Sequence, residues 1–165
     1  MNIRPFLDHT PTLGARVYVD AAATVIGQVA LGDDVSIWPG CVVRGDVNSI
    51  EIGARTNVQD GTIVHVTHEG PFTRPGGFPT VIANDVTIGH GAIIHACRLE
   101  AFCLVGMGAR ILDGAVAKLN VIGALPGNRY GVGIGIPVDA YQKGLLLVGG
   151  VVADIVLVVA PVSEV

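Results

Sequence analysis

The feature that most constrains this chain is a set of aliphatic residues that recurs every six positions. Three triads show the step most clearly: Leu31, Ile37 and Val43, then Ile52, Val58 and Val64, then Ile82, Ile88 and Ile94. An amphipathic helix needs apolar residues every three or four positions and a plain strand every two, so neither explains this period. The pattern instead predicts a solenoid of triangular coils, in which each hexad supplies a short strand and a corner.

The composition agrees with many short strands joined by frequent turns. Hydrophobic residues make up 50% of the chain and aromatic residues only 5%, so the core must consist of aliphatic side chains that favour strands. A β-sandwich would also use short strands, but it has no reason to keep a fixed step through so many turns. We therefore predict one all-β domain, with a hexapeptide-repeat parallel β-helix over residues 1–125. Residues 126–165, where the repeat weakens, form a C-terminal extension of the same domain.

Two interruptions of the repeat indicate segments that leave the coil. The step from Val43 to Ile52 is three residues too long, which predicts a bulge around Arg44-Gly45-Asp46. The step from Val64 to Ile82 is twelve residues too long, and the glycine- and proline-rich residues at about 68–79 account for the excess. We expect an excursion loop there, because surplus residues must leave a regular solenoid.

Charge and cysteine content exclude several classes of function. A net charge of −4 gives no electrostatic reason to expect a nucleic-acid partner. The three cysteines form no CxxC pair, so they predict neither a disulfide framework nor a cysteine zinc site. The N-terminus lacks the apolar stretch of a signal peptide, which favours the cytoplasm. The apolar tail, Gly144 to Val165, is short for a membrane span and contains Asp154, so we expect no membrane association.

Two histidines share one phase of the repeat. His65 directly follows Val64 and His95 directly follows Ile94. Their separation of thirty residues equals one coil of eighteen plus the twelve surplus residues, so both should project from the same face, one coil apart. Adjacent strands lie about 4.8 Å apart, which lets two imidazoles converge on one metal ion. Solvated surface histidines are the alternative, but the shared phase favours ligands.

A third histidine, His90, follows Ile88 by two residues and belongs one hexad earlier, near a different corner. It could not easily reach the same ion within one chain. If three solenoids pack around a threefold axis, His90 of one chain can meet the His65 and His95 face of the next, which predicts a homotrimer. His9 and His68 are expected not to bind metal.

With these residues in view, the chain resembles the γ-class carbonic anhydrases and their YrdA-like and ferripyochelin-binding-like bacterial relatives over residues 10–125. The resemblance rests on Arg44-Gly45-Asp46, Asn57-Val58-Gln59-Asp60, His65-Val66-Thr67-His68, Gly89-His90 and His95. It implies a left-handed β-helix, assembly as a trimer and a C-terminal helix packed along the solenoid.

The resemblance also implies a role for each matching residue. His65 and His95 would bind Zn²⁺ from one subunit and His90 from its neighbour, with Fe²⁺ or Co²⁺ as alternative metals. The implied reaction is reversible hydration of carbon dioxide to bicarbonate by a metal-bound hydroxide. The other matching residues are Asn57 and Gln59, which would line the catalytic pocket, and Arg44, Asp46 and Asp60, which would form an ion-pair network between subunits.

The chain departs from the family pattern in its groups for proton transfer. The best-known active members carry a glutamate directly after the Arg-Gly-Asp motif, whereas Val47 stands here. His68 and Glu69 are the candidate proton acceptors that the excursion loop offers. Three other functions therefore stay open: a non-catalytic metal-binding trimer, a hexapeptide-repeat acyltransferase with one histidine as general base, and another hydrolase that uses the same metal.

Overall fold

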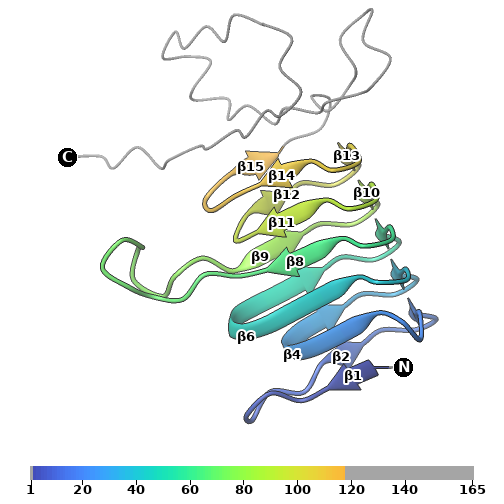
Figure 1. Ribbon diagram of the computed structural model, residues 1–165, viewed down its shortest axis with the longest axis horizontal. Coiled ribbons are helices and arrows are strands. Elements are labelled where there is room, and N and C mark those ends of the chain that lie inside the picture. Colours follow the sequence, from blue (N-terminus) through green and yellow to red (C-terminus); the bar gives the residue numbers. More distant parts are fainter. Residues whose placement is uncertain (1, 118–165) are drawn as a thin grey trace, which may run out of the picture.

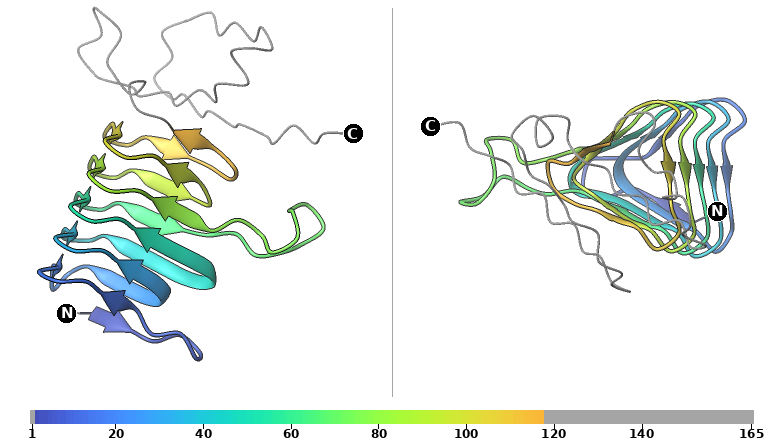
Figure 2. Two further views of the ribbon diagram at one scale, coloured as in Figure 1. Left: turned by 180° about the vertical axis from the view of Figure 1, so that it is seen from behind. Right: turned by 90° about the horizontal axis from the view of Figure 1, so that it is seen from above.

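The computed structural model describes residues 2–117, and they form a stack of coils built from strands alone (Figure 1). Seen along the stack, the coils have a triangular outline (Figure 2). The predicted all-β fold and its parallel β-helix are confirmed, because every pairing between strands is parallel. The predicted C-terminal helix and residues 126–165 lie outside the described residues.

The strands form three faces, numbered here in the order in which the chain meets them after β5. The first face contains the start of β6 (Val42–Ile52), then β8 (Ile63–His65), β11 (Ile93–His95) and β14 (Arg110–Ile111). The second face contains the end of β6, then β9 (Thr80–Ile82), β12 (Arg98–Leu99) and β15 (Val116–Ala117). The third face contains β3 (Tyr18–Val19), β5 (Ser36–Ile37), β7 (Asn57–Val58), β10 (Thr87–Ile88) and β13 (Leu104–Val105).

The first coils are joined by longer strands. β4 (Thr24–Leu31) pairs with β6 along both the first and second faces, with a register shift between Gly27 and Val29. β1 (Asn2–Arg4) and β2 (Thr12–Leu13) pair with the two ends of β4. The predicted bulge at Arg44-Gly45-Asp46 therefore lies where β6 turns from the first face to the second.

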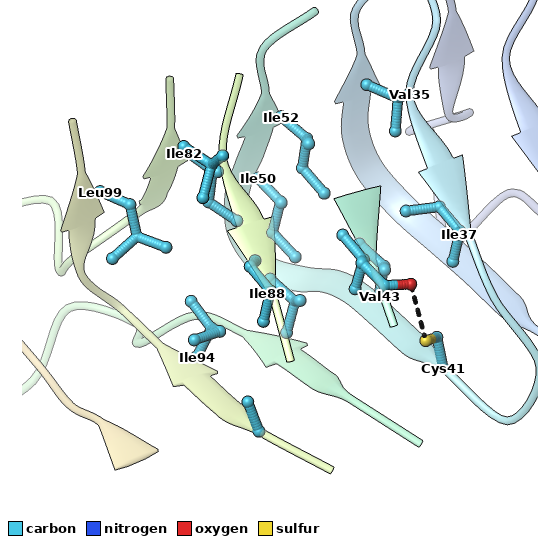
Figure 3. Close-up of a cluster of buried hydrophobic side chains, with 14 of the residues drawn as sticks. Val35, Ile37, Cys41, Val43, Ile50, Ile52, Ile82, Ile88, Ile94 and Leu99 are labelled. Atoms are coloured by element: carbon cyan, nitrogen blue, oxygen red, sulfur yellow. Dashed lines mark hydrogen bonds between the residues drawn. The ribbon is translucent and has the colours of Figure 1, made fainter. Parts of the chain in front are cut away.

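The core consists of the aliphatic residues that set the period of six. On the third face Ile37, Val58, Ile88 and Val105 pair in register, and each side chain is fully buried. Figure 3 shows side chains from all three faces meeting in the interior. Full burial of such a side chain contributes about 1.5–3 kcal/mol. Because each rung is covered only by the rungs above and below it, stability depends on continuous stacking.

The corner between the second and third faces carries a column of charged residues. Asp34, Arg55 and Asp85 occupy successive coils in the left-handed region, with φ of 58°, 59° and 59°. Such angles are uncommon outside glycine, although aspartate tolerates them better than most residues. Arg55 donates two hydrogen bonds to Asp85, at 2.6 and 2.8 Å. Arg16 and Asp34 form the same kind of pair two coils earlier.

The segment between β8 and β9 leaves the stack as a loop (Figure 1). Two hydrogen bonds between the backbones of Thr67 and Phe78, of 3.0 and 2.9 Å, close its base. Further out, Glu69 accepts a hydrogen bond of 2.9 Å from the backbone N–H of Gly76.

The three cysteines, Cys41, Cys97 and Cys103, are buried and form no disulfide, as predicted. Burial raises the pKa of the Cys97 thiol to about 12. Within residues 2–117 we find no helix with the length and hydropathy needed to cross a bilayer.

The stacked core predicts a sharp contrast between inward and outward residues of the third face. We expect Ile88→Ala to lower the free energy of unfolding by about 2–5 kcal/mol, because it opens a cavity inside the stack. Leu104→Ala, at a side chain that is 56% exposed, should cost less than about 1 kcal/mol. Urea unfolding followed by circular dichroism measures both. Similar losses in the two variants would contradict the burial pattern.

Candidate metal centre

His65 on β8 and His95 on β11 are partners in the parallel register of the first face. This confirms that they share a face one coil apart, as their spacing predicts. The Nδ1 atom of His65 lies 3.0 Å from the Nε2 atom of His95, and the ring centroids are 5.0 Å apart. Both side chains are partly buried, with 19% and 30% of their surface exposed. The stack therefore brings one nitrogen of each ring to a common point.

The other nitrogen of each ring faces a carboxylate. Nε2 of His65 lies 2.8 Å from Asp46, and Nδ1 of His95 lies 2.6 Å from Asp113. An ionised carboxylate only accepts hydrogen bonds, so both of these nitrogens must carry the proton. A neutral imidazole has one N–H, which leaves a lone pair on each of the two nitrogens that face each other.

Two lone pairs that converge in this way fit a bound cation. Zinc holds imidazole nitrogens at about 2.0–2.1 Å in a tetrahedron, which places neighbouring ligand atoms roughly 3.4 Å apart. The observed separation of 3.0 Å is close to that value. Carboxylates that accept the outer N–H of metal-binding histidines are also a regular feature of such centres. His65 and His95 therefore fit two of the ligands of a zinc ion.

Arg44 and burial shape the electrostatics around His65. Arg44 forms an ion pair with Asp46, which also holds His65. Burial tends to raise the pKa of Asp46, but the hydrogen bond from His65 and the charge of Arg44 outweigh it, and that pKa is lowered. Burial lowers the pKa of His65 despite the opposing effect of Asp46. Both shifts favour an ionised carboxylate beside a neutral imidazole.

The structure places His90 at the opposite edge of the first face, in the turn after β10. Its Nδ1 atom lies 3.0 Å from Asp60, so Nδ1 carries the proton and Nε2 the lone pair. About half of each side chain is exposed, 51% for His90 and 50% for Asp60. Within residues 2–117, no three His, Cys, Asp or Glu side chains are grouped so that they could hold a metal ion. One chain thus brings His65 and His95 together but not His90.

The surface between the two histidine positions is apolar. Val42, Ile63 and Ile93 are register partners on successive strands and point outward from the first face. Ile63 is 44% exposed. Its position faces outward, so the repeat does not require an apolar residue there. A partly exposed aliphatic column between the half-exposed His90 and the partly buried pair His65 and His95 is the kind of apolar surface that protein interfaces use.

Asn57 and Gln59 lie on the His90 side rather than beside His65. The Asn57 side-chain oxygen accepts hydrogen bonds from Trp38 Nε1 at 2.7 Å and from the Ser36 hydroxyl at 3.0 Å. Gln59 follows β7, and its backbone N–H donates to Ile88 at 2.9 Å. Asn57 therefore lies on the third face, and Gln59 lies next to Asp60 in the corner that also holds His90.

The two candidate proton acceptors lie at the start of the excursion loop. The Glu69 carboxylate is engaged by the Gly76 N–H, and the His68 carbonyl accepts a hydrogen bond of 3.1 Å from Thr73. Both side chains are exposed.

Val47, which stands where active family members carry glutamate, is 47% exposed on the bulge of β6. His9 lies far along the sequence from these groups, where its backbone pairs with that of Phe6.

Sequence reasoning missed Asp113 and Thr67. Asp113 holds His95, and the Thr67 hydroxyl donates a hydrogen bond of 2.5 Å to the second oxygen of Asp113. A signal was present, because Asp113 follows His95 by eighteen residues, which is one coil of the repeat. A carboxylate one coil beyond a histidine is placed to touch it.

The lowered pKa values predict a loss of stability in acid. The unfolded chain regains ordinary pKa values, so it binds more protons than the folded chain as the pH falls. The contribution of Asp46 is complete above the ordinary aspartate pKa of about 3.9 and is lost as the pH falls through its lower folded value. We expect Asp46→Asn, freed of metal by a chelator, to show a shallower decline of unfolding free energy between about pH 5 and pH 3. Equal declines in variant and wild type would contradict the assigned environment of Asp46.

Known proteins share much of this sequence. Protein YrdA of Escherichia coli is 50% identical over 111 residues, which are 67% of this chain and 60% of that protein. The mitochondrial gamma carbonic anhydrase 2 of Arabidopsis thaliana is 46% identical over 115 residues, 70% of this chain and 41% of that protein. The chain thus spans less than two thirds of the length of either relative. No family model matches the chain.

A solved structure supports the same architecture. A Bacillus cereus protein, named as a candidate acetyltransferase, is 36% identical and superposes with a TM-score of 0.63. The match covers 71% of this chain and 64% of that one. The β-helix is therefore shared by proteins whose names point to different chemistry, and the site must decide between them.

Proposed function

Since this chain belongs to the γ-class carbonic anhydrase-like family, we propose that it is a zinc-dependent homotrimer that reversibly hydrates carbon dioxide. The observation that carries this proposal is the pair of imidazole nitrogens, 3.0 Å apart, whose lone pairs are turned toward each other by Asp46 and Asp113. An acyltransferase that uses a histidine as general base needs only one such residue. Two convergent lone pairs are instead what a metal ion requires.

We place the third ligand, His90, on a neighbouring subunit. His90 and His65 lie at opposite edges of the first face, so two copies that meet along this face can bring them together. The aliphatic column Val42, Ile63 and Ile93 supplies apolar surface for that contact. Asp60 supports the assignment, because it leaves the lone pair of His90 on Nε2, the nitrogen farther from the backbone. Closed threefold assembly repeats the contact three times.

Each residue around the site then has a physical role. A zinc ion with three histidine ligands supplies Lewis acidity and lowers the pKa of water to about 7. Asp46 and Asp113 hold the rings of His65 and His95 with the ligating nitrogens inward. Gln59 and Asn57 would reach the pocket from the same subunit as His90, where the Gln59 amide can hydrogen-bond the oxygens of carbon dioxide or bicarbonate. Arg44 keeps Asp46 ionised.

Proton removal is the step for which the chain is least equipped. With Val47 on the bulge, we assign the transfer to His68, whose exposed ring lies three residues after His65, and to buffer molecules. Glu69 is a weaker candidate, because its carboxylate already accepts the Gly76 N–H. We therefore expect turnover that is low and that rises with the concentration of an imidazole buffer.

The test is stopped-flow hydration of carbon dioxide by purified protein whose metal content has been measured by mass spectrometry. We expect His95→Ala to lose at least about 100-fold in rate together with its metal, because one ligand is gone. His9→Ala, a histidine outside the site, is the matched control and should keep both. Metal content will also decide between Zn²⁺, Fe²⁺ and Co²⁺.

Other outcomes would point to the alternatives. A zinc-loaded trimer without hydratase activity would overturn the catalytic proposal and leave a metal-binding scaffold. Metal-independent transfer of an acetyl group from acetyl-CoA to amines would favour the activity named for the Bacillus cereus structure. Because a histidine general base needs no metal ion, chelator treatment separates the two reactions.

The trimer is tested by mixing two inactive variants. Chains with His90→Ala keep His65 and His95, whereas chains with His65→Ala keep His90. After the two are refolded together, each mixed trimer should contain one intact site, so metal binding and activity should return in part. Mixtures that stay as inactive as the parents would refute a site shared between subunits. Size-exclusion chromatography with light scattering measures the mass of the assembly, and capture by an affinity tag on one of the two variants verifies that mixed trimers form.

A further inference from the structure

We propose that Asp113 is a positioning residue that keeps the Nε2 lone pair of His95 turned toward the metal, and that Thr67 at the base of the excursion loop holds Asp113 in place. The inference rests on the proposed metal site. It gives roles to two residues for which the family resemblance implied none, and it links the loop to the affinity for metal.

The first part of the argument is the bond between Asp113 and His95. Nδ1 of His95 and Oδ1 of Asp113 are 2.6 Å apart, a short distance typical of a charge-assisted hydrogen bond. Because the carboxylate can only accept, this contact fixes the proton on Nδ1 and the lone pair on Nε2. Rotation of the His95 ring, or loss of the acceptor, would allow a proton on Nε2 and block the ligand position.

The second part is the support for the carboxylate itself. The Thr67 hydroxyl donates to Oδ2 of Asp113 at 2.5 Å, so each oxygen of the carboxylate has its own donor. Asp113 also lies just before Gly114, whose φ of 73° suits glycine, in a turn closed by the hydrogen bond from Ala115 to Leu112. The backbone turn and the hydroxyl together limit how Asp113 can move.

The third part is the anchoring of Thr67. Its backbone pairs with Phe78 on the other side of the loop base. Its carbonyl oxygen also accepts a hydrogen bond of 3.1 Å from the side chain of Asn48, and the same amide donates to Gly76 at 2.8 Å. A chain of contacts therefore runs from the bulge of β6 through the loop base and Asp113 to His95.

A purely structural role for Asp113 is the competing explanation. In that case the carboxylate would only tie two neighbouring coils together, and the proton on His95 could sit on either nitrogen. The two explanations differ in the tautomer of His95 and in the affinity for metal, and neither quantity depends on catalysis.

The tautomer is measured first, in metal-free wild type, by long-range proton–nitrogen NMR of the histidine rings. We expect His95 to carry its proton on Nδ1, with Nε2 showing the nitrogen shift of an unprotonated ring atom. Asp113→Ala should populate the Nε2–H form, because no acceptor then holds the proton on Nδ1. A wild-type His95 protonated on Nε2 would overturn the inference without reference to any variant.

Zinc affinity is measured next, by competition with a chromogenic chelator at fixed pH. We expect Asp113→Ala to bind zinc about 10- to 100-fold more weakly than wild type. Thr67→Val, which keeps the shape but removes the hydroxyl, should weaken binding by a smaller factor, whereas Thr67→Ser should bind like wild type. Asp85→Asn removes a carboxylate from the charged corner column and serves as the control for general destabilisation.

The outcomes separate this inference from the proposed function. If wild type binds no zinc, the metal site fails, while the Nδ1–H tautomer can still support the role of Asp113 in orienting His95. If wild type binds zinc and Asp113→Ala binds it within about twofold of wild type, the metal site stands and the inference is overturned. Equal weakening in Asp85→Asn and Asp113→Ala would also overturn it, because the effect would then be general.

Discussion

The stacking of one aliphatic side chain per hexad is the constraint on which the rest of this structure depends. Each rung is buried only by its neighbours, so a shift of one residue would turn the core of a coil toward solvent. Residues in excess of the repeat must therefore leave at a corner, as the bulge of β6 and the loop after β8 do. This keeps His65 and His95 in register although the loop separates them in sequence.

The candidate site follows from that rigidity. Strand spacing brings two imidazoles close, but it does not decide which nitrogens face each other. Asp46 and Asp113 decide this, because a carboxylate accepts the N–H and leaves the lone pair on the opposite side of the ring. The same arrangement is used at His90 by Asp60. Three histidines, each with its own carboxylate, are the arrangement that the proposed metal site requires.

Sequence reasoning was most successful where the period of six applied. The parallel β-helix and the pairing of His65 with His95 both follow from counting residues, and the structure confirms both. Asp113 was missed because its link to His95 appears only when polar residues are also compared at one-coil spacing. The charged corner was missed for another reason. Asp34, Arg55 and Asp85 adopt a left-handed backbone conformation, which residue preferences lead one to expect at glycine. The proposed contacts between subunits were also beyond sequence reasoning, because they depend on surfaces that the repeat does not specify.

The hydrogen bonds that close the base of the excursion loop also determine which part of the chain can change in sequence without disturbing the stack. Because the backbones of Thr67 and Phe78 are joined to each other and the Asn48 side chain holds Gly76, the coil fixes the geometry of the loop at its base. Entropy opposes a longer loop only weakly, by about 0.6 kcal/mol for each doubling of its length. The outer part of the loop can thus vary in length and sequence. The hydrogen bonds between Thr67 and Phe78 keep the base of the loop, and the site next to it, in the same geometry. Substrate access and proton transfer can therefore change with the outer loop while the proposed metal ligands stay the same.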